Sequence, residues 1–170
     1  PDTDRLLAPE LGGGAMLDMR VYALTFAHLF LGDPDQVEAV ATMSPNGVDL
    51  NIAMSLGWES GAVAALSSTM TAWSPRTASI ATDRGRVDLD GGFHHPTQAR
   101  WVADGETHLI REDVLGGGLA HEAIEVMRCL RAGETESPLV PLDDSLAIMR
   151  LMDRIRDTIG VRYAADDRPR

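Results

Sequence analysis

The sequence contains no lysine, and all 15 of its basic residues are arginines. A Schiff base, a phosphate-binding loop of the Gly-Lys type and a lysine general acid each need a lysine ammonium group. This chain therefore cannot complete any of these three sites by itself.

Cysteine, basic charge and long apolar runs are also scarce. Cys129 is the single cysteine, which excludes an intrachain disulfide and a zinc site built from several cysteines. The 26 acidic residues outnumber the 15 arginines and give a net charge of −11, which argues against nucleic acid or an anionic membrane as the main partner. No apolar run reaches the roughly 18 residues of a membrane span, and residues 1–4 lack the pattern of a secretion leader. We therefore expect a cytoplasmic protein that binds neither nucleic acid nor membrane.

What is present is typical of a folded domain with its own core. The 170 residues are 44% hydrophobic and 24% charged, a balance that disfavours intrinsic disorder. Apolar residues recur with a helical period in some stretches and alternate in others. Helices are predicted over residues 15–31, 119–132 and from 143 or 144 to 159, and strands over 37–43, 48–58, 62–70, 77–82, 87–90, 99–103 and 107–111.

Short turn sequences join most of these strands, which favours antiparallel pairing. The predicted fold class is α+β: a largely antiparallel open sheet of six to seven strands, with the helices packed on one face. The strand at 48–58 has a large apolar residue at every second position, whereas residues 62–70 are small on both faces. The helix-free face of the sheet is therefore either solvated or the surface of a homodimer. The charged segment after Tyr163 is expected to fray.

Asp18 and Tyr22 are four residues apart on the first predicted helix and so share a face, one turn after three consecutive glycines. A carboxylate beside a phenol can orient the hydroxyl, which makes a recognisable acid–base pair. In the alternative, purely structural interpretation, Asp18 interacts favourably with the helix dipole and Tyr22 packs at the edge of the core. From the spacing alone, the structural interpretation is favoured.

The histidines offer weaker candidates. His94 and His95 lie in a loop between two glycines and a proline, where surface histidines, pocket lining and a metal site are the alternatives. Adjacent side chains normally point apart, which disfavours the metal site. His121 opens the second predicted helix after Gly116–Gly118, without the second histidine that a metalloprotease motif requires. Cys129 lies mid-helix and is interpreted as a packed residue rather than a nucleophile.

Three segments resemble the Gfo/Idh/MocA family, named after glucose–fructose oxidoreductase and inositol dehydrogenase. The first is Glu-Leu-Gly-Gly-Gly-Ala-Met-Leu-Asp over residues 10–18, followed by Val-Tyr at 21–22. The second comprises residues 118–125, 128–133 and 136–138, and the third is the helix at 146–163. Together they are most similar to the dihydrodiol/xylose dehydrogenase-like branch, which tends to carry tyrosine where inositol dehydrogenases carry histidine.

The resemblance implies that residues 1–170 form a C-terminal domain for substrate binding and oligomerisation. The family's N-terminal Rossmann domain, with its Gly-rich fingerprint and its lysine, is absent from this chain. NAD(P) is then the cofactor of a longer parent protein, and none is expected on this chain.

The resemblance also assigns roles to individual residues. It places Asp18 and Tyr22 at the family's catalytic positions, and the approach of a cofactor is assigned to the backbone of Gly13 and Gly14. Arg20 stands where the family usually has glycine. Its cation would point into solvent, fill the pocket or recognise an anionic substrate. Together with His94, His95 and His121, it is a candidate substrate-binding residue.

Two hypotheses follow for the whole protein. In the first, the parent oxidises a sugar, polyol or dihydrodiol hydroxyl with NAD(P), and Tyr22 moves the proton while Asp18 orients. In the second, the chain is a non-catalytic binding or assembly module that keeps the same fold, an alternative favoured by Arg20. A carboxyl group titrates near pH 4 and a phenol near pH 10, so a phenol is the better proton donor at neutral pH.

Overall fold

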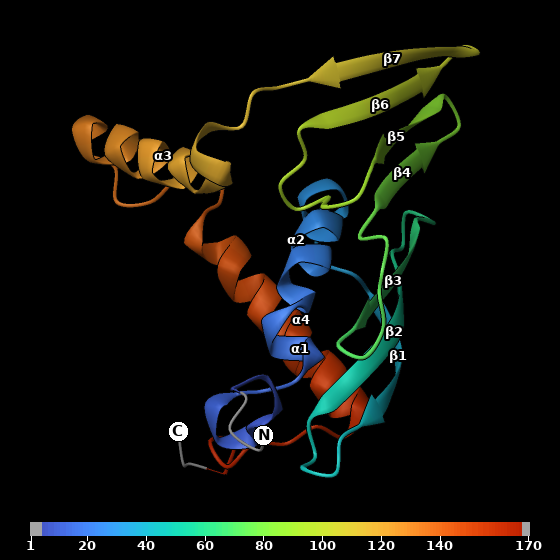
Figure 1. Cartoon of the computed structure of the whole chain (residues 1–170), viewed down its shortest axis with the longest axis vertical. Coiled ribbons are helices and arrows are strands. Elements are labelled where there is room, and N and C mark those ends of the chain that lie inside the picture. The colour runs from blue at the N-terminus through green and yellow to red at the C-terminus, as the bar shows by residue number, and fades with distance from the viewer. Residues whose placement is uncertain (1–4, 168–170) are drawn as a thin grey trace. The chain divides into compact units, whose positions relative to one another are not determined.

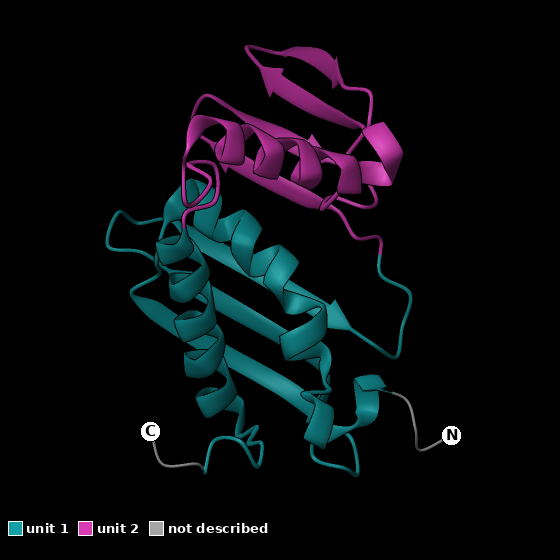
Figure 2. Cartoon of the chain, turned by 90° about the vertical axis from the view of Figure 1, so that its left-hand side faces the viewer, with its two compact units in different colours: residues 1–74, 142–170 teal, residues 75–141 magenta. Residues whose placement is uncertain are grey.

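The computed structural model describes residues 5–167, which divide into two compact units. Unit 1 comprises residues 1–74 and 142–170, and unit 2 comprises residues 75–141. Figure 2 shows the two units in different colours. The chain therefore leaves unit 1 after the third strand and returns to it for the last helix.

Unit 1 consists of a three-stranded antiparallel sheet and helices from both ends of the chain. The sheet has the order β1-β2-β3 and is formed by β1 (Gln36–Met43), β2 (Asp49–Gly57) and β3 (Val63–Thr69). Two short 3₁₀ helices, η1 (Arg5–Leu7) and η2 (Pro9–Leu11), precede α1 (Ala15–Asp18) and α2 (Arg20–Leu31), and α4 (Leu142–Ile159) follows unit 2.

The three α-helices of unit 1 cover one face of its sheet (Figure 1). Helix α4 packs on β1, α1 on β2 and α2 on β3. Ile52, Met54 and Leu56 of β2 are buried against the helices, while the intervening Ala53 and Ser55 are exposed. This alternation confirms the strand that the sequence pattern predicts at 48–58. The core also contains Met16, Leu24, Ile148, Leu151, Met152 and Ile155.

The first helix differs from its predicted form because it is divided at Met19. Met19 has φ −102° and ψ −20°, and its N–H still donates to the carbonyl of Ala15 at 3.1 Å. The backbone therefore stays close to helical, and the apolar period runs on from α1 into α2. Because the apolar period continues through Met19, the sequence pattern does not show where the helix divides.

Unit 2 contains a four-stranded antiparallel sheet in the order β4-β5-β6-β7, followed by a helix. Its elements are β4 (Ala78–Thr82), β5 (Gly85–Leu89), β6 (Gln98–Ala103), β7 (Glu106–Arg111), η3 (Leu115–Gly118) and α3 (Leu119–Ala132). Tight turns join β4 to β5 and β6 to β7, and Gly133 ends α3 with φ +72°. The apolar side chains of Ile124, Met127 and Leu130 on α3 remain exposed.

The α+β class and the antiparallel pairing are confirmed. All seven predicted strands are present, but they form sheets of three and four strands instead of one. The division falls between β3 and β4, where Trp73 is fully exposed and Pro75 begins unit 2. Among residues 5–167, none of the helices combines the length and the apolar character needed to span a bilayer. The cytoplasmic location stays a prediction.

Candidate functional site

Asp18 and Tyr22 lie on the solvent-facing side of the α1–α2 junction in unit 1. Asp18 is the last residue of α1, and Tyr22 is in the first turn of α2. The Asp18 side chain is 28% exposed, and Tyr22 is 50% exposed. Both side chains therefore contribute to the surface of unit 1.

Arg5 is a neighbour of Asp18 that the sequence analysis does not identify. One of its Nη atoms lies 2.6 Å from Asp18 Oδ1, in an ion pair between η1 and the end of α1. The pair is partly exposed, so it adds little to stability, but it restricts the direction of the carboxylate. Thirteen residues separate the two side chains across the glycine turn. No local sequence pattern could have revealed this contact.

Gly13 and Gly14, the residues predicted to meet a cofactor, are held by hydrogen bonds within the chain. The N–H of Gly13 donates to the carbonyl of Ala8 at 2.9 Å, and that of Gly14 donates to the carbonyl of Leu6 at 2.8 Å. A Cβ on Gly13 would lie 2.7 Å from the Leu6 carbonyl oxygen, and one on Gly14 would lie 2.5 Å from Asp49 Oδ1. Because both N–H groups are already bonded within the chain, they do not fit a dinucleotide phosphate.

Arg20 is completely buried, together with Asp49 at the start of β2. The interpretation that its cation points into solvent is therefore wrong. One Nη of Arg20 donates to the carbonyl of Ile52 at 3.4 Å. A substrate could reach this guanidinium only if the side chain left its place in the core. The role of Arg20 in substrate binding stays a prediction.

Burial lowers the pKa of Arg20 and raises the pKa of Asp49, and the charge of each residue opposes the shift of the other. Burial lowers the pKa of Arg20 to about 10, and the negative charge of Asp49 opposes that fall. Burial raises the pKa of Asp49, against the backbone N–H groups of Asp49 and Met16 and the positive charge of Arg20. Each charge therefore stabilises the ionised form of the other.

Tyr163 follows α4 near the other end of the sequence and contacts the glycine turn that precedes α1. Its hydroxyl donates to the carbonyl of Gly13 at 2.6 Å, and the residue is 8% exposed. Burial is the main cause that raises the pKa of Tyr163 to about 12, and the charge of Asp49 adds to it. Of the chain's two tyrosines, Tyr163 is thus held in the interior and Tyr22 reaches solvent.

The three candidate histidines lie in unit 2. His94 and His95 meet edge to face with ring centroids 4.3 Å apart, and burial lowers the pKa of His94 with help from His95 and Arg76. His121 Nε2 accepts a hydrogen bond from the N–H of Leu115 at 3.2 Å, which ties α3 to η3. Within the described part of the chain, no group of three or more His, Cys, Asp or Glu side chains could hold a metal ion. A substrate contact for these histidines stays a prediction.

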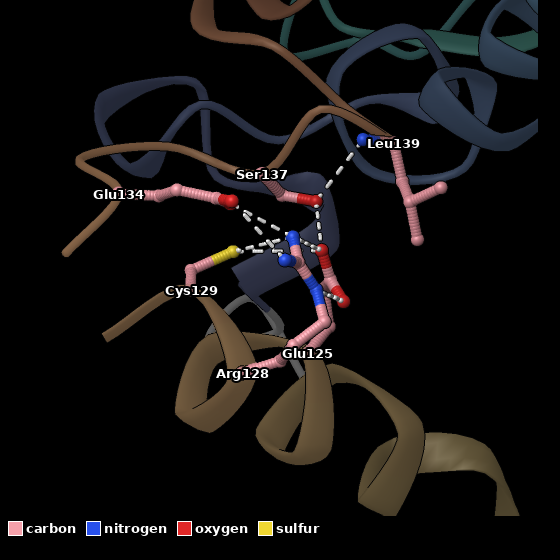
Figure 3. A network of polar contacts seen from close by, with 6 residues as sticks. All are labelled: Glu125, Arg128, Cys129, Glu134, Ser137 and Leu139. Carbon is pink, nitrogen blue, oxygen red and sulfur yellow. Dashed lines mark hydrogen bonds and ion pairs between the residues drawn. The ribbon is translucent and has the colours of Figure 1, made fainter. Parts of the chain in front are cut away.

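Arg128 centres a polar network at the end of α3 (Figure 3). Its guanidinium donates to Glu125 and to Glu134 at 2.9 Å, and Ser137 Oγ donates to Glu125 at 2.6 Å. The Arg128 hydrogen bond is the main cause that lowers the pKa of Glu125 to about 2. Burial raises the pKa of the Cys129 thiol, which suits a packed side chain better than a nucleophile. The network fastens residues 134–137 to the helix.

The comparisons with known proteins agree with this architecture. The family described as the GFO/IDH/MocA C-terminal domain matches residues 1–88, and this chain belongs to it. Trans-1,2-dihydrobenzene-1,2-diol dehydrogenase of Xenopus tropicalis is 31% identical over 169 residues, covering 94% of this chain and 51% of that protein. The Homo sapiens protein of the same name is 29% identical over 166 residues, covering 92% of this chain and 49% of that protein. The chain thus spans about half the length of the curated relatives it matches.

Solved structures share the fold at lower identity. The aldose–aldose oxidoreductase of Caulobacter crescentus, complexed with glycerol, gives a TM-score of 0.80 at 21% identity over 94% of this chain and 50% of that chain. The 3-ketoreductase KijD10 of Actinomadura kijaniata, in complex with NADP, gives a TM-score of 0.78 at 24% identity over the same shares. These two likenesses establish the fold, and together with the family match they confirm the resemblance carried by the sequence motifs.

Proposed function

We propose that the protein containing this chain is an NAD(P)-dependent oxidoreductase that acts on a sugar, polyol or dihydrodiol hydroxyl. This chain is then its C-terminal substrate-binding domain. The observation that carries the proposal is the pair of Asp18 and Tyr22, which reach solvent together at the position of the family motif. The names of the relatives support it, since they describe dehydrogenation of a dihydrodiol and oxidoreduction of aldoses.

Tyr22 is the proposed acid–base residue. In the direction of reduction, its neutral phenol gives a proton to the alkoxide oxygen that forms on the substrate, and in oxidation the proton moves back. Asp18, restrained by Arg5, offers an acceptor oxygen that orients the substrate hydroxyl beside this phenol. The division of roles follows from chemistry, because a carboxylate at neutral pH has no proton to give.

The cofactor is not assigned to the residues of this chain. Gly13 and Gly14 were the candidates for it, and their N–H groups are occupied by Ala8 and Leu6. We place NAD(P) on the N-terminal Rossmann domain expected in the longer parent, whose relatives extend well beyond the matched half. The NADP in the complex of KijD10 supports a nicotinamide cofactor for the longer parent.

The alternative function is a non-catalytic module with the same fold. Arg20 is the sequence feature that favours it, on the premise that a cation intrudes on the site. Because the Arg20 side chain is buried away from Asp18 and Tyr22, it leaves their exposed surface unchanged. The oxidoreductase proposal is therefore preferred.

The partner of this chain is proposed to be a second copy, in addition to its own N-terminal domain. The face of the β1–β3 sheet opposite the helices is exposed and carries mainly small side chains, including Ala53, Ala65 and Ser67. Val40 and Val63 are 70% and 75% exposed on the same face. A surface on which small side chains predominate lets two sheets approach closely, which suits an isologous dimer.

One measurement separates the enzyme from the module, and a second tests the domain assignment. We expect the full-length protein to reduce NAD⁺ or NADP⁺ in the presence of a trans-dihydrodiol, an aldose or a polyol, followed by absorbance of the reduced nicotinamide. We expect the 170-residue chain alone to show no dinucleotide binding by calorimetry, because its glycine-turn N–H groups are taken. No turnover with any member of the panel would favour the module, and micromolar dinucleotide binding by the short chain would overturn the domain assignment.

A further inference from the structure

The α1–α2 junction directs its side chains to opposite sides. Successive helical residues are rotated by about 100°, so positions 18 and 22 share a face and position 20 lies nearly opposite. The exposures follow this geometry, with Asp18 and Tyr22 open to solvent and Arg20 completely buried. The same helical turn therefore places Asp18 and Tyr22 at the surface and the Arg20 guanidinium in the core.

Arg20 attaches this turn to the start of β2. One Nη donates to the carbonyl of Ile52, and the guanidinium interacts with the charge of Asp49. Asp49 is itself completely buried, and its Oδ1 lies against the backbone of Gly14, just before α1. The carboxylate is thus enclosed between the glycine turn and the helix junction.

Two opposite charges buried beside a helix junction, Arg20 and Asp49, are an unusual way to hold a helix on a sheet. Apolar residues of similar volume often stabilise a core equally well, whereas removing one member of such a pair leaves an uncompensated buried charge. Among the described residues, Arg20 Nε and Arg20 Nη1 have no hydrogen-bond partner within the chain. Burying these two charges is therefore a costly way to stabilise the core, and the directional hydrogen bond from Arg20 to the Ile52 carbonyl is what an apolar side chain would lack.

We propose that Arg20 and Asp49 are positioning residues, which fix the α1–α2 junction on β2 and so set the directions of Asp18 and Tyr22. The proposal rests on the proposed oxidoreductase function for its catalytic consequence. Its structural consequence is independent of that function. Neither residue touches the substrate; both act through the backbone of residues 14–22.

The test compares variants of the full-length protein in which the charges are removed singly or together. Arg20→Met and Asp49→Leu each leave one buried charge without its partner and should lower the unfolding temperature. The double variant Arg20→Met/Asp49→Leu replaces the pair with apolar side chains and should recover much of that loss. Ile148→Val, an uncharged truncation in α4 of the same core, is the control for general loss of packing.

Two readouts then distinguish positioning from a merely structural role. We expect kcat of the double variant to stay about 10-fold to 100-fold below wild type although its stability recovers, because a small misplacement of a reacting group costs this much. We expect amide hydrogen exchange at Asp18 and Met19, whose N–H groups bond to Gly14 and Ala15, to become at least about 10-fold faster. Ile148→Val should change neither value.

Each outcome decides the proposal. If the double variant recovers wild-type stability, kcat and hydrogen exchange together, the proposal is overturned. Apolar packing would then replace Arg20 and Asp49 without any loss. Should the double variant fail to fold, Arg20→Lys provides the second arm: it retains the cation without the planar fork, and wild-type kcat and exchange in that variant would also overturn the proposal. If wild-type protein turns over no alcohol, the proposed function has failed, and the exchange rates alone decide whether the pair orders the junction.

Discussion

Gly14→Ala is expected to destabilise unit 1 well beyond the usual cost of replacing a glycine. Gly14 has φ +114° and ψ +155°, a region that residues with a Cβ rarely adopt. Backbone strain of this kind costs about 1–3 kcal/mol. The new methyl group would also lie 2.5 Å from Asp49 Oδ1, so a buried carboxylate must move. Overpacking adds about 1–3 kcal/mol, giving a sum of about 2–6 kcal/mol.

Gly32→Ala is the matched control for this substitution. Gly32 also lies outside the common regions, with φ +69° and ψ −156°, and an added Cβ there would meet nothing within 4 Å. The control therefore carries the strain without the collision. Equilibrium urea unfolding, followed by far-ultraviolet circular dichroism, should show that Gly14→Ala lowers the free energy of unfolding by about 1–3 kcal/mol more than Gly32→Ala.

A double-mutant cycle with Asp49→Ala isolates the collision. In that background the methyl group meets no carboxylate, so Gly14→Ala should cost only its strain, and the coupling energy should be about 1–3 kcal/mol. Equal losses for Gly14→Ala and Gly32→Ala, within about 0.5 kcal/mol, would refute the contact on which this reasoning depends.

Three further predictions concern other parts of the chain. Tyr163→Phe should lower the free energy of unfolding by about 1–2 kcal/mol, because the buried carbonyl of Gly13 loses its donor, and an unchanged urea midpoint would contradict this. Glu125 has a lowered pKa, so its contribution to stability is complete above the unfolded value of 4.5 and is lost as the pH falls toward about 2. Over that range the protection of α3 amides from hydrogen exchange, measured relative to their intrinsic rates at each pH, should fall in wild type and not in Glu125→Gln, and equal protection in both would contradict this. Ala65→Glu on the open face of β3 should reduce a dimeric mass to a monomeric one in light scattering, whereas Ala81→Glu on β4 should leave it unchanged, and a wild type that is monomeric at high concentration would exclude the proposed interface.

Local patterns predicted the strands well because each strand of unit 1 has one buried face. The alternation of Ile52, Met54 and Leu56 with exposed neighbours is visible directly in the sequence. The alternation fails at the start of β2, where Asp49 occupies one of the intervening polar positions of the pattern and is completely buried. The register between β1 and β2 shifts at Thr42 and Met43, and an irregularity of this kind reverses which residues face the core. A sequence pattern cannot show such a shift.

The candidate site was predictable only as far as its local geometry extends. Asp18 and Tyr22 share a helical face whatever the tertiary structure, so their spacing was informative. Arg5 and Tyr163 approach the glycine turn from distant parts of the chain, and only the folded structure brings them there. The segment after Tyr163 was expected to fray, yet Asp166 accepts hydrogen bonds from Arg156 and from the N–H of Tyr163. The sequence of this charged segment does not show that Arg156 lies within hydrogen-bonding distance of Asp166.

The central claim is that Tyr22 moves the proton, and the most direct test compares the chain's two tyrosines in the full-length protein. We expect Tyr22→Phe to lower kcat by about two to four orders of magnitude between pH 6 and 9, the usual effect of removing an acid–base group. Tyr163→Phe should keep kcat close to wild type while losing stability, since its hydroxyl bonds to the backbone in the interior. Wild-type kcat in Tyr22→Phe across this range would contradict the claim and leave Tyr22 as a residue at the edge of the core.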